Sequence, residues 1–347
     1  MKLMIGRSIG TYTLAITGGV LFWALRLPLA WILGPVALLM VYKLLVKKET
    51  YSSSFIRNTG FNLMGIQIGL TFSSHTFSSV LPYLLPYTFL SLMIIAISLC
   101  LAVVISKRTS VDLTTSMIGS APGGLSAMIA VSDSLRGNTI LVTIFQTIRL
   151  ISVLFIVPFI AVHFLYQDHA SSAGGALAAD RDGPFWTVLF YFVAFITGYL
   201  LKNKIPASFI IIPMLSFGLL QSLGFSVYEL PNIWFIAAQL VIGAHLGHTI
   251  ELRDVIKAGR YCAYYFVLAL LLITCSLVLG CLLSLWTDMN LTTAILSLAP
   301  GGLIEMAVTA GGAGGDPAIV SSLQIIRLLT IVLLLPFLFK KFIPKLI

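Results

Sequence analysis

Charged residues are scarce in this chain of 347 residues, and acidic residues are the scarcest of them. Only 10% of the residues are charged, whereas a soluble domain carries roughly a quarter. Apolar residues make up 59%, and the mean hydropathy is +1.03. This balance excludes an ordinary soluble domain and predicts an all-α polytopic membrane protein. The net charge of +9 does not indicate a nucleic-acid partner, because Lys and Arg stand beside the ends of apolar runs, as membrane anchors do.

Histidine and cysteine are too few to suggest a metal centre or a redox site. The four cysteines lie in apolar runs without C-x-x-C spacing, which is typical of small buried side chains. His245 and His248 could share one helix face, but a convincing third metal ligand is missing. The phosphate-binding motif G-x-x-x-x-G-K-S/T is missing too, so we expect no ATP hydrolysis. We predict no catalytic residues, no metal and no cofactor, and therefore not an enzyme.

Long apolar runs take the place of the missing charges. Runs such as 80–105 and 261–286 are long enough to cross about 30 Å of hydrocarbon. They are continuous rather than alternating, which predicts helices instead of barrel strands. The apolar segments are 8–25, 29–46, 58–73, 80–105, 112–131 and 138–165 in the first half, and 185–201, 206–224, 232–250, 261–286, 290–310 and 316–339 in the second.

The second half of the chain repeats the first at an offset of 178 residues. Ala-Pro-Gly-Gly-Leu at 121–125 returns at 299–303, and 17 of 47 positions agree without a gap between 113–159 and 291–337. We therefore predict a duplicated membrane unit, which is typical of many transporters. The predicted organisation is one repeat over 1–166, a polar Gly-rich linker over 167–184, and a second repeat over 185–347.

Basic residues follow different segments in the two halves. They cluster after the second and fourth segments of the first half, at Lys47 and Lys107, and after the first and third of the second, at Lys202 and Arg253. If basic loops are cytoplasmic, the repeats have inverted topology, and both termini are cytoplasmic. Inversion requires an odd number of crossings per repeat. We therefore predict ten crossing helices and two broken or re-entrant segments, because Pro and Gly interrupt each Ala-Pro-Gly-Gly segment.

Two Gln-x-x-Arg motifs are the candidate binding residues. Gln146 and Arg149 are matched at the repeat offset by Gln324 and Arg327, and a spacing of three places each pair on one helix face. An Arg at the centre of a bilayer costs at least ~3 kcal/mol unless it is paired or hydrated. Two interpretations stay open. Each Arg binds carbonyl groups of a broken segment, or it binds an anionic ligand through its planar fork.

The broken segments and one buried acid complete the candidate site. Helix N-termini exposed at the Gly-Gly breaks would add positive dipole ends for an anion. Glu305 lies inside an apolar segment and is replaced by Ala127 in the first repeat, so it is either an ion-coupling group or the partner of one Arg. The four glycines predicted to bind substrate are Gly123, Gly124, Gly301 and Gly302.

The doubled A-P-G-G-L and Q-x-x-R pattern, with G-x-x-x-G pairs at 65–69 and 243–247 upstream, resembles the AbrB-duplication family of bacterial membrane proteins. The resemblance covers essentially the whole chain and implies an integral inner-membrane protein with two related halves. Labels in that family include an ammonia monooxygenase and a regulator of an alkylation-response gene. The family shares its name with a short, charged, β-rich DNA-binding regulator, which this chain does not resemble.

Three functions are compatible with these features. We favour a secondary transporter of a small anionic or zwitterionic metabolite, driven by an ion gradient, because repeats with paired interruptions point to a binding site at the middle of the membrane. The alternatives are a membrane regulatory protein that affects gene expression without transport and a membrane enzyme such as the monooxygenase of the label. The expected partners are a small-molecule substrate, the lipid bilayer and a second copy of the chain.

Overall fold

The computed structural model describes residues 2–46, 50–123, 125–165 and 183–346. Within these ranges every regular element is a helix, which confirms the predicted all-α class. The first half contains α1 (Lys2–Ala24), α2 (Ala30–Val46), α3 (Ser54–Leu70), α4 (Thr76–Val80), η1 (Leu81–Tyr83), α5 (Leu84–Arg108), α6 (Leu113–Ser120), α7 (Leu125–Ser134) and α8 (Thr139–Phe164). The second contains η3 (Phe185–Thr187), α9 (Val188–Leu200), α10 (Ser208–Ser222), α11 (Asn232–Thr249), α12 (Leu252–Lys257), α13 (Arg260–Thr287), α14 (Leu291–Leu298), α15 (Leu303–Gly312) and α16 (Pro317–Leu346).

Four helical stretches among the described residues are long and apolar enough to cross a membrane. They are Thr76–Arg108, Thr139–Phe164, Tyr261–Thr287 and Pro317–Leu334. Several of the other predicted spans form shorter apolar helices of 10–17 residues, among them α2 and α10. The helical character of the apolar runs is therefore confirmed, and the total of ten crossings stays a prediction.

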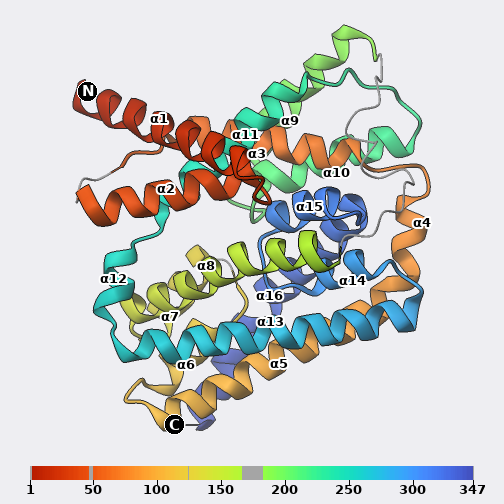
Figure 1. The fold of residues 1–347 in the computed structure, drawn as a ribbon. Helices are drawn as coiled ribbons and strands as arrows, with labels where there is room; N and C mark the ends of the chain where they lie inside the picture. Colours follow the sequence, from red (N-terminus) through yellow and green to blue (C-terminus); the bar gives the residue numbers. More distant parts are fainter. Residues whose placement is uncertain (1, 47–49, 124, 166–182, 347) are drawn as a thin grey trace.

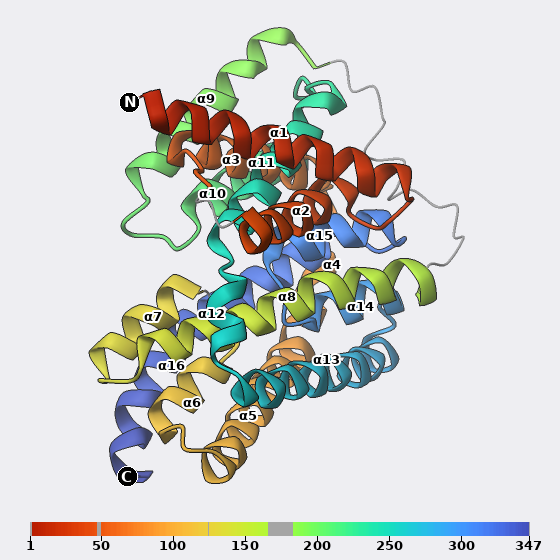
Figure 2. The same ribbon diagram turned by 60° about the vertical axis from the view of Figure 1, so that its left-hand side comes forward.

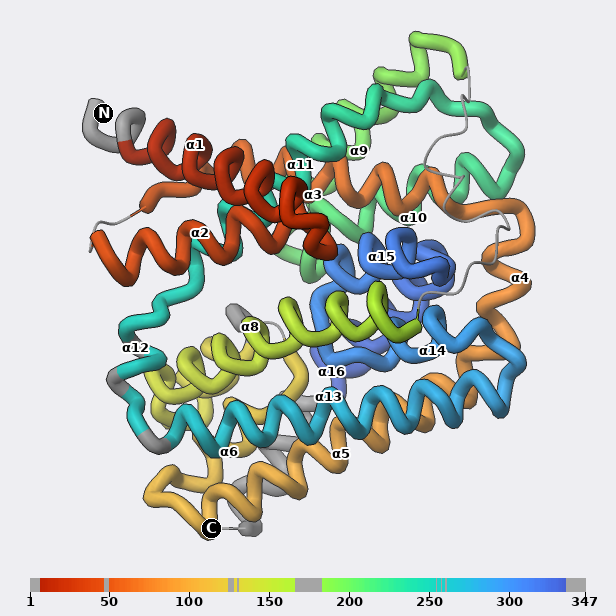
Figure 3. The backbone as a smooth tube through the Cα atoms, in the orientation of Figure 1, coloured from red at the N-terminus to blue at the C-terminus, as the bar shows by residue number. Residues whose placement is uncertain are grey.

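The helices gather into two bundles, and each bundle takes helices from both halves of the sequence (Figure 1). The upper bundle contains α1–α3 and α9–α11, and the lower bundle contains α5–α8 and α13–α16 (Figures 1 and 2). The short helices α4 and α12 run between the bundles on opposite sides of the molecule (Figures 1 and 3). The predicted division at 167–184 falls largely outside the described residues, and the spatial grouping cuts across it.

Glycine allows helices from opposite halves to approach closely in the upper bundle. A Cβ placed on Gly65 of α3 would lie 2.5 Å from the carbonyl oxygen of Ile210 in α10. A Cβ on Gly243 of α11 would lie equally close to the carbonyl oxygen of Ile32 in α2. Both partners are related by the same 178-residue offset. The G-x-x-x-G pairs therefore serve close helix packing, since any larger side chain would collide with backbone.

Each Ala-Pro-Gly-Gly sequence ends one short helix and leads into another. Pro disfavours helical geometry in the residue before it, and Ala121 and Ala299 accordingly have ψ values of 133° and 134°. The chain then turns back, and a hydrogen bond joins the two ends of each helix pair. The backbone N–H of Asn138 donates to Thr115 Oγ1 at 2.8 Å, and that of Asp316 donates to Thr293 Oγ1 at 2.9 Å. The helix pairs α6–α7 and α14–α15 are thus hairpins, with their open ends tied together.

Candidate functional site

The first Gln-x-x-Arg motif caps the carbonyl end of α6. Gln146 Nε2 donates to the carbonyl oxygens of Ile118 and Ala121, both at 2.9 Å. Arg149 Nη1 donates to the Ala121 carbonyl at 3.3 Å, and Nη2 donates to the Gly123 carbonyl at 2.9 Å and to Gln146 Oε1 at 2.8 Å. The last carbonyls of a helix have no partner within it, so two side chains of α8 supply donors to the end of α6 and to the break that follows it.

The second motif makes the same arrangement at the end of α14. Gln324 Nε2 donates to the carbonyls of Leu296 at 2.9 Å, Ser297 at 3.1 Å and Ala299 at 3.3 Å. Arg327 donates from Nη1 to the Ala299 carbonyl and from Nη2 to the Gly301 carbonyl at 2.8 Å, and Nη2 also bonds Gln324 Oε1. A cation at the negative end of a helix is electrostatically favourable as well.

These bonds bear on the two interpretations of the Arg residues, which were binding to backbone carbonyls or binding to an anionic ligand. Both guanidinium groups bind carbonyls of the broken segments, as the structural interpretation of the motif expects. Their charges are not cancelled by this, because a carbonyl is neutral. Arg149 Nε is buried and lacks a hydrogen-bond partner among the described residues, so one of its donors is left over. Anion binding by these Arg residues therefore stays a prediction.

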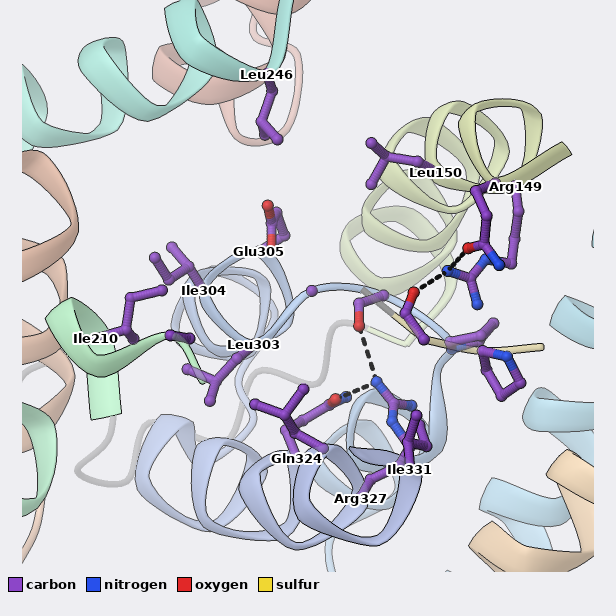
Figure 4. A pocket seen from close by; sticks show the side chains of 18 of the residues that line it. Arg149, Leu150, Ile210, Leu246, Leu303, Ile304, Glu305, Gln324, Arg327 and Ile331 are labelled. Atoms are coloured by element: carbon purple, nitrogen blue, oxygen red, sulfur yellow. Dashed lines mark hydrogen bonds between the residues drawn. The ribbon is translucent and has the colours of Figure 1, made fainter. Parts of the chain in front are cut away.

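Both breaks face one cavity of about 280 Å³ (Figure 4). Its walls bring together Pro122 and Pro300, which lie far apart in the sequence. The predicted site residues that line it are Gln146, Arg149, Gln324, Arg327, Gly123, Gly301, Gly302 and Glu305. Gly124 was also predicted to bind substrate, but it lies outside the described residues. We call this space the central cavity.

Glu305 lies in the first turn of α15, beside the central cavity. Glu305 is only 8% exposed, and among the described residues the structure shows no cation at ion-pair distance from it. Figure 4 shows the side chain pointing away from Arg327 and Gln324. The carboxylate folds over Gly302, where an added Cβ would overlap Glu305 Oε2. Of the two predicted roles, that of a partner for one Arg has no bond to support it here.

Apolar residues that sequence reasoning did not single out close the cavity. Phe61 of α3, Ile210 of α10 and Leu246 of α11 contribute from the upper bundle. They carry no motif, and their meeting depends on contacts between distant segments. A hydrophobic wall opposite two cations and a carboxylate is typical of a small-molecule site.

The two histidines of α11 take separate positions. His248 Nδ1 lies 2.8 Å from Thr50 Oγ1, whereas the His245 ring meets the Phe61 ring edge-on at 6.0 Å. No group of three His, Cys, Asp or Glu side chains capable of holding a metal occurs in the described part of the chain. Nothing in this arrangement adds a ligand to the pair that the sequence suggested.

Comparison with known proteins places the chain in a family. It matches the family described as "Transition state regulatory protein AbrB" over residues 11–343. It is 27% identical over 288 residues to "Uncharacterized protein YhjN" of Bacillus subtilis (strain 168), which covers 79% of this chain and 75% of that protein. It is also 27% identical over 324 residues to "Putative regulator AbrB" of Escherichia coli (strain K12), covering 90% and 89%. Because the match spans nearly the whole sequence, the chain belongs to the AbrB family.

Proposed function

We propose that this protein is a secondary transporter of a small anionic or zwitterionic metabolite in the bacterial inner membrane, coupled to an ion gradient. The observation that carries the proposal is the central cavity, where two broken hairpins, two Arg residues and one acid meet. Interrupted helices that line a cavity between two repeats are the usual construction of a transporter binding site.

Equivalent hydrogen bonds at opposite ends of the molecule support inverted topology. Lys43 Nζ of α2 donates to the His248 carbonyl of α11 at 2.6 Å, and Gln221 Nε2 of α10 donates to the Leu70 carbonyl of α3 at 3.5 Å. Both partners of the second bond are the repeat mates of the first. The first bond lies beside α12 and the second beside the turn into α4, on opposite sides of Figure 1. In a membrane these sides would face opposite compartments, as ten crossings and two hairpins require.

The charge balance of the central cavity favours an anionic group. Two guanidinium groups and one carboxylate leave an excess of one positive charge when all are ionised. The Arg–carbonyl bonds hold the guanidinium groups in fixed positions, so a carboxylate or phosphate would find them already oriented. Glu305 would then carry the coupling ion, because a buried carboxylate with no cation paired to it in the described part of the chain is suited to bind a proton or a metal cation.

Flux into proteoliposomes tests this proposal. Proteoliposomes that contain the purified protein and are loaded with one candidate anion should exchange it for labelled external anion. An imposed proton or sodium gradient should drive accumulation of that anion. Glu305→Gln should keep exchange but lose gradient-driven accumulation, because it removes the titratable group and preserves the shape. A wild type that exchanges no small anion under any gradient would contradict transport.

The names of the relatives support a second candidate. One relative is called a regulator, and these names point to regulation rather than to an enzyme. A membrane regulator would bind a ligand in the central cavity without moving it across. Binding without flux in the experiment above would favour this second function.

A further inference from the structure

A second, larger cavity of about 1270 Å³ opens beside the central cavity. The two share four lining residues, namely Phe61, Ala207, Ile210 and Leu328. We propose that this larger space, called here the vestibule, is a water-filled entrance whose outer wall binds an anionic group, a carboxylate or a phosphate, before it reaches the central cavity. This inference rests on the proposed function, since it names the path to that site.

The wall of the vestibule is basic. Arg57 of α3 and Lys202, just after α9, both line it, and the described lining residues include no acid. Arg57 donates from Nε and Nη2 to the neutral Asn58 Oδ1, at 3.1 and 3.0 Å. Lys202 Nζ lies 4.0 Å from the centre of the Tyr199 ring. Neither partner is a carboxylate, so the positive potential persists in a confined space and raises the local concentration of anions.

The repeat provides an internal comparison, because a feature required by the fold should occur twice. At the matching positions of the other repeat, Phe235 stands for Arg57 and Ala24 stands for Lys202. The polar Asn58 and Asn203 are matched by Ile236 and Leu25 in the same way. The repeated fold therefore forms with apolar side chains at the matching positions, and the basic vestibule occurs in only one of the two related places.

Packing is looser at the vestibule than at the place related to it by the repeat. Val332 of α16 lines the vestibule, whereas its repeat mate Leu154 of α8 is 2% exposed and packs in a cluster with Leu33. Likewise Ile210 lines both cavities, whereas its mate Ile32 is fully buried. The structure is thus open on the vestibule side and closed on the related side.

The passage between vestibule and central cavity carries a polar group without a partner. His245 lines the vestibule next to Phe61, and its buried Nδ1 has no hydrogen-bond partner among the described residues. Such a nitrogen is costly unless water or a ligand reaches it. Its placement beside the shared residue Phe61 fits a wet passage between the two spaces.

Charged thiol reagents test the vestibule without requiring transport. In a variant with the four native cysteines replaced, Val332→Cys would be treated with a negatively and a positively charged methanethiosulfonate in phosphatidylcholine vesicles. We expect the anionic reagent to react faster by roughly tenfold, as electrostatic focusing allows. The double variant Arg57→Gln/Lys202→Gln should abolish this preference. Lys204→Gln, which removes a neighbouring charge outside the vestibule lining, should leave it unchanged.

Two further arms make the outcome specific. Leu154→Cys, the repeat mate of the reporter, should be unreactive to both reagents. Inorganic phosphate should slow the anionic reagent if the site takes soluble anions. Slowing by phosphatidylglycerol, normalised to the exposed reporter Ile256→Cys, would instead assign the site to lipid headgroups, and either result supports an anion site. An unreactive Val332→Cys, or a preference that survives the double variant, would overturn the proposal.

The thiol-reactivity experiment distinguishes failure of the vestibule proposal from failure of the proposed function. A charge-selective vestibule in a protein that moves no anion would disprove transport and leave the vestibule intact. Anion flux through a protein whose Val332→Cys shows no charge preference would do the reverse.

Discussion

The two hairpins hold their helix ends in the same way, but the surroundings of the two hairpins differ. Gln146 and Arg149 bind carbonyls of the break that follows α6, as Gln324 and Arg327 bind those of the break that follows α14. In contrast, Glu305 follows only the second break, since Ala127 takes its place after the first. Features present in both halves therefore build the frame, and features present in one half are the candidates for function.

Removal of a shared Arg should have the largest effect. Arg327→Ala removes the guanidinium donor from the Leu298 and Gly301 carbonyls. Because each buried acceptor left without a donor costs about 1–3 kcal/mol, we expect the free energy of unfolding to fall by about 3–5 kcal/mol. Arg149→Ala should cost less, because Arg149 is less buried than Arg327. Chemical denaturation of the detergent-solubilised protein measures both. A change below about 1 kcal/mol in Arg327→Ala would show that these carbonyl bonds add little to stability.

The Gly302–Glu305 contact distinguishes the two hairpins and should give the next largest effect. Gly302→Ala forces the carboxylate from its place, so we expect a loss of about 1–3 kcal/mol in unfolding free energy. In the Glu305→Ala background the carboxylate is absent, so adding Gly302→Ala should cost little. The double variant Gly302→Ala/Glu305→Ala should therefore be nearly as stable as Glu305→Ala. Additive effects in this double-mutant cycle would contradict the contact.

Close helix packing should respond equally in the two halves. Gly65→Ala and Gly243→Ala place a methyl group against the same backbone atom of symmetry-related helices, so each should lower the unfolding free energy by about 1–3 kcal/mol. Gly10→Ala is the matched control, because nothing lies within 4 Å of its added Cβ. Clearly unequal losses at Gly65 and Gly243 would break the comparison.

The smallest effect is expected where the two halves use different residues for one bond. Lys43 Nζ binds the His248 and Ile250 carbonyls and pairs with Glu251, whose side chain is 54% exposed. Lys43→Gln installs the residue found at the mate position 221, and we expect a loss of about 1 kcal/mol in unfolding free energy. A loss as large as that of Arg327→Ala would show that the Lys43 bonds are not equivalent to the bond of Gln221.

The sequence predicts those features of the fold that have a local cause. Pro122 and Pro300 are each followed by two glycines, and this combination favours a break, whereas Pro35 and Pro158 lie inside continuous helices. The spacing of Gly65 and Gly69 predicts a small helix face. The helix class followed from long apolar runs without alternation. The offset of 178 residues matched elements that occupy corresponding places in the fold.

The arrangement of helices from distant parts of the chain could not be predicted from the sequence pattern. The sequence divides into two consecutive halves, whereas the bundles interleave them, because α3 finds its partner in α10 and α2 finds its partner in α11. The cavity wall formed by Ile210 and Leu246 depends on that interleaving. The role of Arg149 was also undecidable from a motif, since one guanidinium can hold a carbonyl with some donors and a ligand with others.

Thermal stability of the purified protein with a panel of small carboxylates and phosphates tests the central claim most directly. An anion at 100 times its dissociation constant should stabilise the wild type by about 2.7 kcal/mol if it binds only the folded protein. We predict such an anion, with the shift retained in Arg57→Gln/Lys202→Gln and lost in a folded Arg149→Gln protein. A panel in which no anion raises the melting temperature, or a shift that persists in Arg149→Gln, would contradict an anion site at the central cavity.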